Sequence, residues 1–258
     1  MALNKEIWVN DIKEMLLPDN SFVTKGENYS AFADNNTIHI PVETGNVNVE
    51  IDRSVLPGAI STTVETENYI TMHHFTTDPQ RVFRPGDIEL SYDKRRLISK
   101  KIVDGLNNKI ADYALGVLAQ IGGDSIAASA KVLDKLAATA LAFDQANYPD
   151  QERYVLLSAA SYAKLLKELT DNQTNAFLSV ANASTGVVGS VFGLNILKRS
   201  TLGTGVDVIK WHKSDYMFAL GNIDIYTQEN APEYYGTILS ASARFGAYTP
   251  PTTTGTNN

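Results

Sequence analysis

The chain has 258 residues, of which 43% are hydrophobic and 20% are charged, and its formal net charge at pH 7 is −7. This length is enough for one large domain or two interleaved lobes with a substantial core. The acidic balance argues against a dedicated nucleic-acid-binding domain, and the lack of cysteine excludes disulfides and thiolate chemistry. The first residues show no signal-peptide pattern, and no apolar run reaches membrane-spanning length, so we expect no membrane association.

The N-terminal segment predicts short elements that need support from elsewhere. Residues Ile7–Leu17 have the periodicity of an amphipathic helix that ends before Pro18. A helix this short is not stable alone, so it must dock on another surface. Phe22–Asp34 is predicted to be an extended arm. Alternating apolar and polar residues predict strands at Thr37–Pro41 and Val47–Ile51.

The stretch Asp52–Phe83 is rich in Thr, Val, Ile and Tyr, and it predicts a strand at Val64–Met72. Turn signals occur at Pro57-Gly58 and Asp78-Pro79. The apolar content is thin for a segment that buries its own core, and a lone hairpin is only marginally stable in water. One interpretation is therefore an extended two-stranded flap that lies on another molecule. The other is an ordinary edge hairpin of the same domain.

The most informative stretch is Asp93–Ile121, where apolar residues recur in steps of three and four and no proline intervenes. The pair Gly122-Gly123 marks its end. Such a helix would be roughly 40 Å long. We expect it to be a spine against which sheets pack. A kinked pair of shorter helices is the alternative, because Gly105 and Asn107-Asn108 are poor helix formers.

The second half of the sequence alternates helices and strands. Helical spacing predicts a helix at Ser129–Ala142, and the apolar run Arg153–Ser158 predicts a strand buried on both faces. Ser158 can cap the next predicted helix, Ala159–Leu169. Further strands are predicted at Gly186–Phe192, Leu194–Arg199, Val206–Trp211, Tyr216–Leu220, Ile223–Glu229 and Tyr235–Tyr248. The tail Thr249–Asn258 has almost no apolar content and is predicted to be disordered.

No pattern in the sequence supports catalysis, a cofactor or a metal. His73 and His74 are neighbours in a predicted strand, so they point to opposite faces and cannot chelate one ion together. The glycines lack the Walker and dinucleotide-binding contexts, and no serine lies in a nucleophile elbow. A basic cluster fits a solvated helix face, a neighbour's carboxylates or phosphate: Lys94, Arg95, Arg96, Lys100 and Lys101. We therefore predict a protein that is not an enzyme.

The chain contains four phrases that resemble the major capsid proteins of tailed bacteriophages, in this order: NKEIWVNDIKEMLLPDNSF, DRSVLPGAI, ELSYDKRR and RYVLLSAASYAKLLKEL. The resemblance covers nearly the whole chain and implies an α+β protein with the Hong Kong ninety-seven-like fold. It implies these parts: an N-terminal arm (1–49), an extended β-hairpin loop (50–84), a peripheral domain with the spine helix (85–128), an axial domain of mixed sheet and helices (129–230), a returning strand (231–248) and a disordered tail (249–258).

The resemblance also implies a function. The protein would self-assemble into the hexamers and pentamers of an icosahedral head around double-stranded DNA, without reading its sequence. It would assemble in the bacterial host cytoplasm, reside in the virion, and meet a portal protein and a separate scaffold or decoration protein. Bacterial encapsulin shells share the fold and are the alternative. We expect inter-subunit contacts at Trp8, Phe22, Tyr69, Arg81, Arg95 and Arg96.

Four expectations follow for the arm and the loop. Each buries too little surface alone, so both should order only on assembly. Deleting Ser54–Arg81 should therefore leave a folded subunit that cannot assemble. The loop contains no lysine between Glu50 and Phe83, so we expect none of the covalent cross-links found in some members of the family. The arm begins without a long scaffolding extension, which implies a separate scaffold or none.

Overall fold

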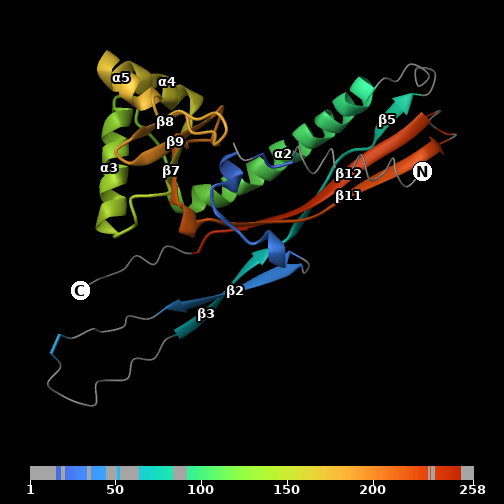
Figure 1. The fold of residues 1–258 in the computed structure, drawn as a ribbon, viewed down its shortest axis with the longest axis horizontal. Helices are drawn as coiled ribbons and strands as arrows, with labels where there is room; N and C mark the ends of the chain where they lie inside the picture. The colour runs from blue at the N-terminus through green and yellow to red at the C-terminus, as the bar shows by residue number, and fades with distance from the viewer. Residues whose placement is uncertain are drawn as a thin grey trace.

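The computed structural model describes residues 16–18, 21–33, 36–44, 51–52, 64–83, 92–231, 233 and 236–250. The chain is an α+β protein (Figure 1). Its elements in chain order are η1 (Phe22–Thr24), β1 (Glu27–Asn28), η2 (Ser30–Phe32), β2 (Thr37–Thr44), β3 (Val64–Thr71), β4 (His73–Thr76), β5 (Gln80–Phe83), α2 (Tyr92–Gly122), β6 (Gly123–Asp124), α3 (Val132–Gln145), β7 (Arg153–Ser158), α4 (Ala159–Glu168), α5 (Asp171–Leu178), β8 (Gly189–Val191), β9 (Leu194–Arg199), β10 (Val208–His212), η4 (Lys213–Asp215), β11 (Met217–Ala231) and β12 (Gly236–Tyr248).

Helix α2 is one uninterrupted helix of 31 residues, which confirms the predicted spine and excludes the kinked pair. One stripe along it is buried, with exposed fractions between 0% and 3%: Ile102, Leu106, Ile110, Ala114 and Leu118. This stripe belongs to a core that also takes side chains from both large sheets. Because tertiary packing supplies most helical stability in proteins, the poor helix formers within the stretch do not break it.

The first large sheet is built on the long antiparallel ribbon of β11 and β12, and β1, β4 and β5 pair along its edges. The sequence predicted two separate strands where β11 is continuous, so that prediction is wrong. The register between β11 and β12 shifts between Leu220 and Ile223. Such an irregularity breaks the apolar–polar alternation without ending the strand, because the pairing resumes after it.

The second large sheet has the strand order β6-β10-β7-β9-β8. Its central strand β7 is buried on both faces, as predicted: Leu156 packs toward α2, whereas Val155 and Leu157 pack toward α3 and α4. The Ser158 side chain accepts a hydrogen bond from the backbone N–H of Ser161, which confirms the predicted cap of α4. The structure also contains α5, which the sequence analysis did not predict.

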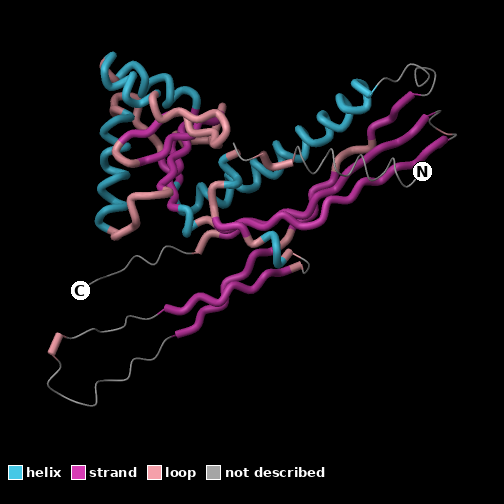
Figure 2. The backbone as a smooth tube through the Cα atoms, in the orientation of Figure 1, coloured by secondary structure: helices cyan, strands magenta, loops and turns pink. Residues whose placement is uncertain are grey.

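The third sheet is the two-stranded hairpin of β2 and β3, which extends away from the rest of the chain (Figure 2). Its first strand lies in the range expected for the arm. Its base is anchored by a small core of Ile38, Ile40, Ile70 and Met72. The predicted strand at Val47–Ile51 and the tail from residue 251 on lie outside the described residues, except for Ile51, which lies in a turn. The domain ranges expected from the resemblance stay predictions.

The described part of the arm packs on its own chain. Phe22 and Val23 are buried with α2, β1 pairs with β11, and the indole N–H of Trp211 donates a hydrogen bond of 2.9 Å to the Lys25 carbonyl. The expectation that the whole arm orders only on assembly is therefore wrong for residues 21–33. Three backbone and packing anchors within one chain are enough to hold this segment. Most of the predicted helix Ile7–Leu17 lies outside the described residues.

Candidate assembly surfaces

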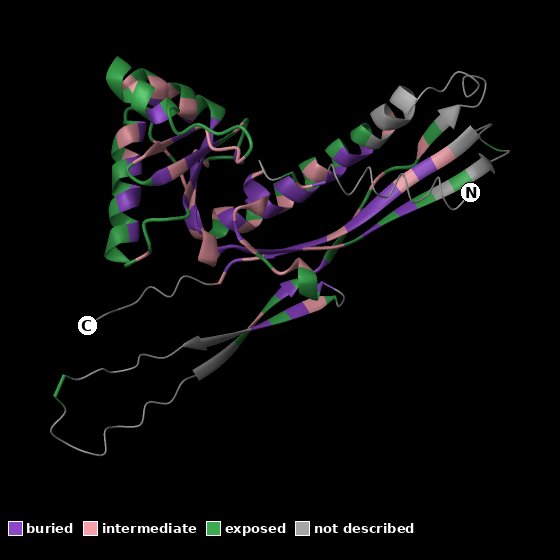
Figure 3. Ribbon diagram, in the orientation of Figure 1, coloured by how far each residue is buried: buried purple, intermediate pink, exposed green. Residues whose placement is uncertain are grey.

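The hairpin β2–β3 presents the most projecting surface of the described chain. Tyr69 on β3 is 56% exposed, whereas its neighbour Ile70 is fully buried. Figure 3 shows buried and exposed positions alternating along the described part of this hairpin. His39 and Glu67 approach to 4.0 Å across the two strands, with both side chains mostly exposed. An ion pair this exposed contributes little to stability. The hairpin is thus fixed at its base, and the side chains of Tyr69 and Glu67 are exposed to solvent.

A groove of about 540 Å³ lies between α2 and the segment His74–Gln80. Phe75, Ile102 and Leu106 line it with apolar surface, and its charged lining residues are Lys101, Lys109 and Asp78. At Gly105, which also lines the groove, no atom from other described parts of the chain lies within 4 Å of the position that a Cβ would take. The groove therefore suits an apolar segment that carries carboxylates and approaches the helix backbone closely.

Phe22, an expected inter-subunit contact, lies in the interior of its own chain and is only 8% exposed. The guanidinium of Arg199 on β9 lies 5.3 Å from the centre of the Phe22 ring and is also bonded to Asp112 of α2 at 2.7 Å. Phe22 thus joins the arm to the spine helix and the second sheet. Sequence reasoning could not place it because this packing connects segments far apart in the chain.

Of the other expected contact residues, the side chains of Tyr69 and Arg81 are described, and these two residues lie in different sheets. Tyr69 is in the hairpin sheet, while Arg81 is in β5 and pairs at the backbone with Ile238 of β12. Arg95 and Arg96 are in the first turns of α2, and their side chains lie outside the described part, as does Trp8. Their role in contacts between subunits stays a prediction.

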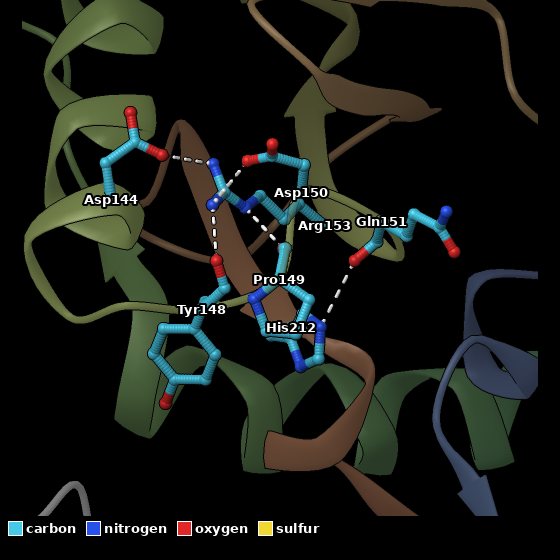
Figure 4. Close-up of polar contacts among 7 residues, drawn as sticks. All are labelled: Asp144, Tyr148, Pro149, Asp150, Gln151, Arg153 and His212. Atoms are coloured by element: carbon cyan, nitrogen blue, oxygen red, sulfur yellow. Dashed lines mark hydrogen bonds and ion pairs between the residues drawn. The ribbon is translucent and has the colours of Figure 1, made fainter.

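A buried arginine joins α3 to the second sheet (Figure 4). Arg153 is 3% exposed, and its guanidinium reaches Asp144 at 2.7 Å and Asp150 at 3.0 Å. Its remaining N–H groups donate to the carbonyls of Tyr148 at 2.6 Å and Pro149 at 2.8 Å. A buried charge is tolerated only when it is paired and hydrogen-bonded, and here both conditions are met.

His212 and Tyr148 extend this joint (Figure 4). The Nε2 atom of His212 lies 3.2 Å from the Gln151 carbonyl, and a carbonyl oxygen only accepts, so Nε2 carries the hydrogen. The Tyr148 hydroxyl donates to Asp215 at 2.9 Å. Burial, together with the nearby Asp215 charge, raises the pKa of Tyr148 to about 12. These groups hold the 146–152 loop against η4 and therefore serve the shape of the domain.

Within the described ranges, no three His, Cys, Asp or Glu residues are grouped as a metal site would require. No helix in these ranges combines the length and hydropathy needed to cross a membrane. His73 and His74 face different surroundings, as expected for neighbours in a strand: His73 lies 5.1 Å from the Tyr113 ring, and His74 lines the groove.

Two features of the second sheet were missed by the sequence analysis. Helix α5 begins with a capping box in which Thr170 and Gln173 exchange side-chain and backbone hydrogen bonds, and this pattern is readable in the sequence. The exposed Phe192 lies in the turn between β8 and β9 with a positive φ of 51°. No sequence signal predicts that conformation for phenylalanine, because Asn, Asp and Gly are the residues that favour it.

No protein-family profile matches the chain, and no curated protein matches it. Solved structures do resemble it. The capsid structure of the cyanophage P-SCSP1u matches with a TM-score of 0.64 at 16% identity, over 89% of this chain and 84% of that one. A Mycobacterium phage Che8 structure matches with a TM-score of 0.64 at 13% identity, over 89% and 87%. A virus-like particle from Pyrococcus furiosus matches with a TM-score of 0.63 at 13% identity, over 95% of both chains.

These matches cover 89–95% of this chain and 84–95% of the other chains. At these identities they show the fold. The α+β arrangement expected from the sequence is confirmed, and the chain has the Hong Kong ninety-seven-like fold of phage capsid shell proteins.

Proposed function

We propose that this chain is the major capsid protein of a tailed double-stranded DNA bacteriophage and self-assembles into the hexamers and pentamers of its icosahedral head. The observation that carries the proposal is the β2–β3 hairpin, which is fixed at its base and projects from an otherwise packed chain. The protein would reside in the virion, contact a portal protein and a scaffold or decoration protein, and have no catalytic role.

The hairpin of one copy would lie along the groove of the next copy. The Glu67 side chain on the hairpin is 84% exposed, and the groove combines apolar side chains with two lysines, Lys101 and Lys109, against one carboxylate, Asp78. Opposite charges on the two surfaces favour this pairing and set its orientation. Each contact is weak alone, but a shell repeats it many times, and simultaneous contacts raise the overall affinity by several orders of magnitude.

Shortening the hairpin tests the proposal. The broad deletion of Ser54–Arg81 considered above would remove β3, β4 and the buried Ile70 and Met72, so it would disturb the subunit's own packing as well as any contact between copies. A better variant replaces Val42–Thr66 by Asn-Gly, since Pro41 and Glu67 are paired across the strands. We expect a subunit with an unchanged circular dichroism spectrum that forms no shells by electron microscopy. Normal shells from this variant would refute the role of the hairpin.

A charge exchange tests the groove. Lys101→Glu and Glu67→Lys should each raise the concentration needed for assembly by about tenfold, and the double variant should recover part of the loss. Lys100→Glu is the matched control, because Lys100 is exposed on the same helix but does not line the groove. Equal effects of Lys100→Glu and Lys101→Glu would assign the loss to net charge and not to the groove.

An encapsulin-like compartment that holds a cargo protein is the alternative function. The virus-like particle resembles the chain no more closely by TM-score than the phage capsids do, so the comparisons do not favour this alternative. The contents of particles isolated from the natural source would distinguish a phage head from an encapsulin-like compartment. A phage head would contain double-stranded DNA, whereas a compartment would contain a cargo enzyme and little nucleic acid.

A further inference from the structure

A pocket of about 300 Å³ lies at the root of the hairpin, where β3 and β4 meet α2 and β12. Four of its lining side chains are rings, one from each of these elements: Tyr69, His73, Tyr113 and Tyr248. Elements far apart in the sequence thus bring the four rings together within one chain. The volume is at the lower end of the range of small-molecule sites, about 300–1,000 Å³.

Three of these rings are held in place by other groups of the chain. The centre of the His73 ring lies 5.1 Å from that of Tyr113, and Tyr113 also packs edge-on against Phe245 at 6.2 Å. The Tyr248 hydroxyl donates a hydrogen bond of 2.9 Å to the side-chain oxygen of Asn68. Because these side chains are already ordered, a ligand would lose little affinity to ordering them.

The lining of the pocket suits a cation. Among the described residues that line it, Glu67 is the one with a formal negative or positive charge. Aromatic faces attract ammonium groups, and hydroxyl oxygens accept hydrogen bonds from them. Burial raises the pKa of Tyr113, and burial together with the nearby Tyr69 raises the pKa of Tyr248, so both hydroxyls are protonated at neutral pH. An anion would instead face the Glu67 carboxylate.

We propose that this pocket, here called the aromatic pocket, binds a linear alkyl diamine. One ammonium lies among the rings, and the other pairs with the exposed carboxylate of Glu67. Two features that attract cations match the two ends of a diamine, whereas a lysine side chain has a single ammonium. The net charge of −7 favours the approach of such a ligand. The bound diamine joins the hairpin to α2 and the first sheet.

Titration of the unassembled subunit with 1,4-diaminobutane, followed by NMR, tests the proposal. The subunit is kept unassembled because Glu67 is also proposed to face the groove of another copy. His39 approaches Glu67 to 4.0 Å, so the titration is done at pH 8, where free imidazole is largely uncharged. We expect a dissociation constant of about 1 mM or below. Butylamine, with one ammonium, should bind about tenfold more weakly, and uncharged 1,4-butanediol should not bind.

Substitutions separate the two halves of the pocket. Tyr69→Leu should weaken diamine binding by about tenfold, whereas Tyr69→Phe keeps the ring and should retain most of the affinity. Glu67→Gln should lower the affinity for the diamine to that for butylamine and leave butylamine binding unchanged. Tyr226→Leu is the control, because Tyr226 is 58% exposed and does not line the pocket.

Two results would overturn the proposal. One is equal binding of 1,4-diaminobutane and 1,4-butanediol, or equal effects of Tyr69→Leu and Tyr226→Leu. The other is binding of Nα-acetyl-lysine methylamide as tight as that of the diamine, which would assign the pocket to a side chain of another protein. Neither result bears on shell formation. Conversely, a chain that binds the diamine but forms no particle under any condition would overturn the proposed function alone.

Discussion

The hydroxyl of Tyr216 is buried in the core without a hydrogen bond to any described residue. The whole residue is fully buried. Its ring also packs against Gly26, where an added Cβ would lie only 2.3 Å from it. The ring thus fixes the arm against β11, while the hydroxyl has lost its water without gaining a partner. A buried polar group in this state lowers stability by about 1–3 kcal/mol.

Tyr216→Phe should therefore raise the free energy of unfolding by about 1 kcal/mol, since the ring and its packing are kept while the unsatisfied hydroxyl is removed. Urea unfolding of the unassembled subunit measures the change. The matched variant is Tyr148→Phe, which removes a hydrogen bond to Asp215 and should lower the free energy by about 1 kcal/mol. Destabilisation by both variants would mean that Tyr216 has a partner after all.

Two exposed glycines of α2 allow the stability of the subunit and its assembly to be tested separately. Gly105 and Gly116 are both exposed, and neither has an atom within 4 Å of the position of an added Cβ. Replacing either by alanine should stabilise the subunit by about 0.5–1 kcal/mol, because alanine restricts the unfolded chain and suits a helix. At Gly122 an added Cβ would overlap the Lys210 carbonyl at 1.9 Å, so Gly122→Ala should cost about 1–3 kcal/mol.

Gly105→Ala and Gly116→Ala should both stabilise the subunit but should differ in their effect on shell assembly. Gly105 lines the groove proposed to receive the hairpin, whereas Gly116 does not. We therefore expect Gly105→Ala to raise the melting temperature and weaken assembly, and Gly116→Ala to raise the melting temperature alone. Differential scanning fluorimetry and sedimentation of the same preparations measure both quantities. Equal assembly of the two variants would show that no partner approaches the helix backbone at Gly105.

The accuracy of prediction from sequence depended on whether an element's signal is local. Helix α2 and strand β7 were predicted correctly because a long periodic stripe and an uninterrupted apolar run are local patterns. The continuity of β11 was missed because a register shift interrupts its alternation. The burial of Phe22 and the pairing of β2 with β3 depend on contacts between distant segments, so no window of sequence reveals them. The strain at Phe192 was missed because it lies in the backbone, not in the residue pattern.

The largest core of the described chain is shared between its two large sheets. Helix α2 contributes to this core along its length, with the arm on one side and side chains from β7, β9, β10, β11 and β12 on the other. The ion pair of Arg199 with Asp112 ties β9 to the middle of the same helix. The two sheets therefore cannot move apart without exposing this core. The base of the hairpin packs in a separate core, whereas two residues of the shared core, Ile102 and Leu106, line the groove.

The stability of the folded subunit should decrease at alkaline pH, because burial raises the pKa of several tyrosine hydroxyls. Burial raises the pKa of seven described tyrosines: Tyr29, Tyr113, Tyr148, Tyr154, Tyr162, Tyr216 and Tyr248. Above the ordinary tyrosine pKa of about 10, the unfolded chain loses these protons while the folded chain retains them. Their contribution to stability is therefore complete below about pH 10 and is lost as the pH rises through the higher folded values.

We expect the melting temperature of the unassembled subunit to be level between about pH 7 and pH 9 and to fall by several degrees by about pH 11. The double variant Tyr148→Phe/Tyr216→Phe should fall less steeply, because two of the raised hydroxyls are gone. Tyr226→Phe is the control at a tyrosine that is 58% exposed, and it should follow the wild type. Parallel curves for all three proteins would show that other groups govern alkaline unfolding and that the buried hydroxyls do not.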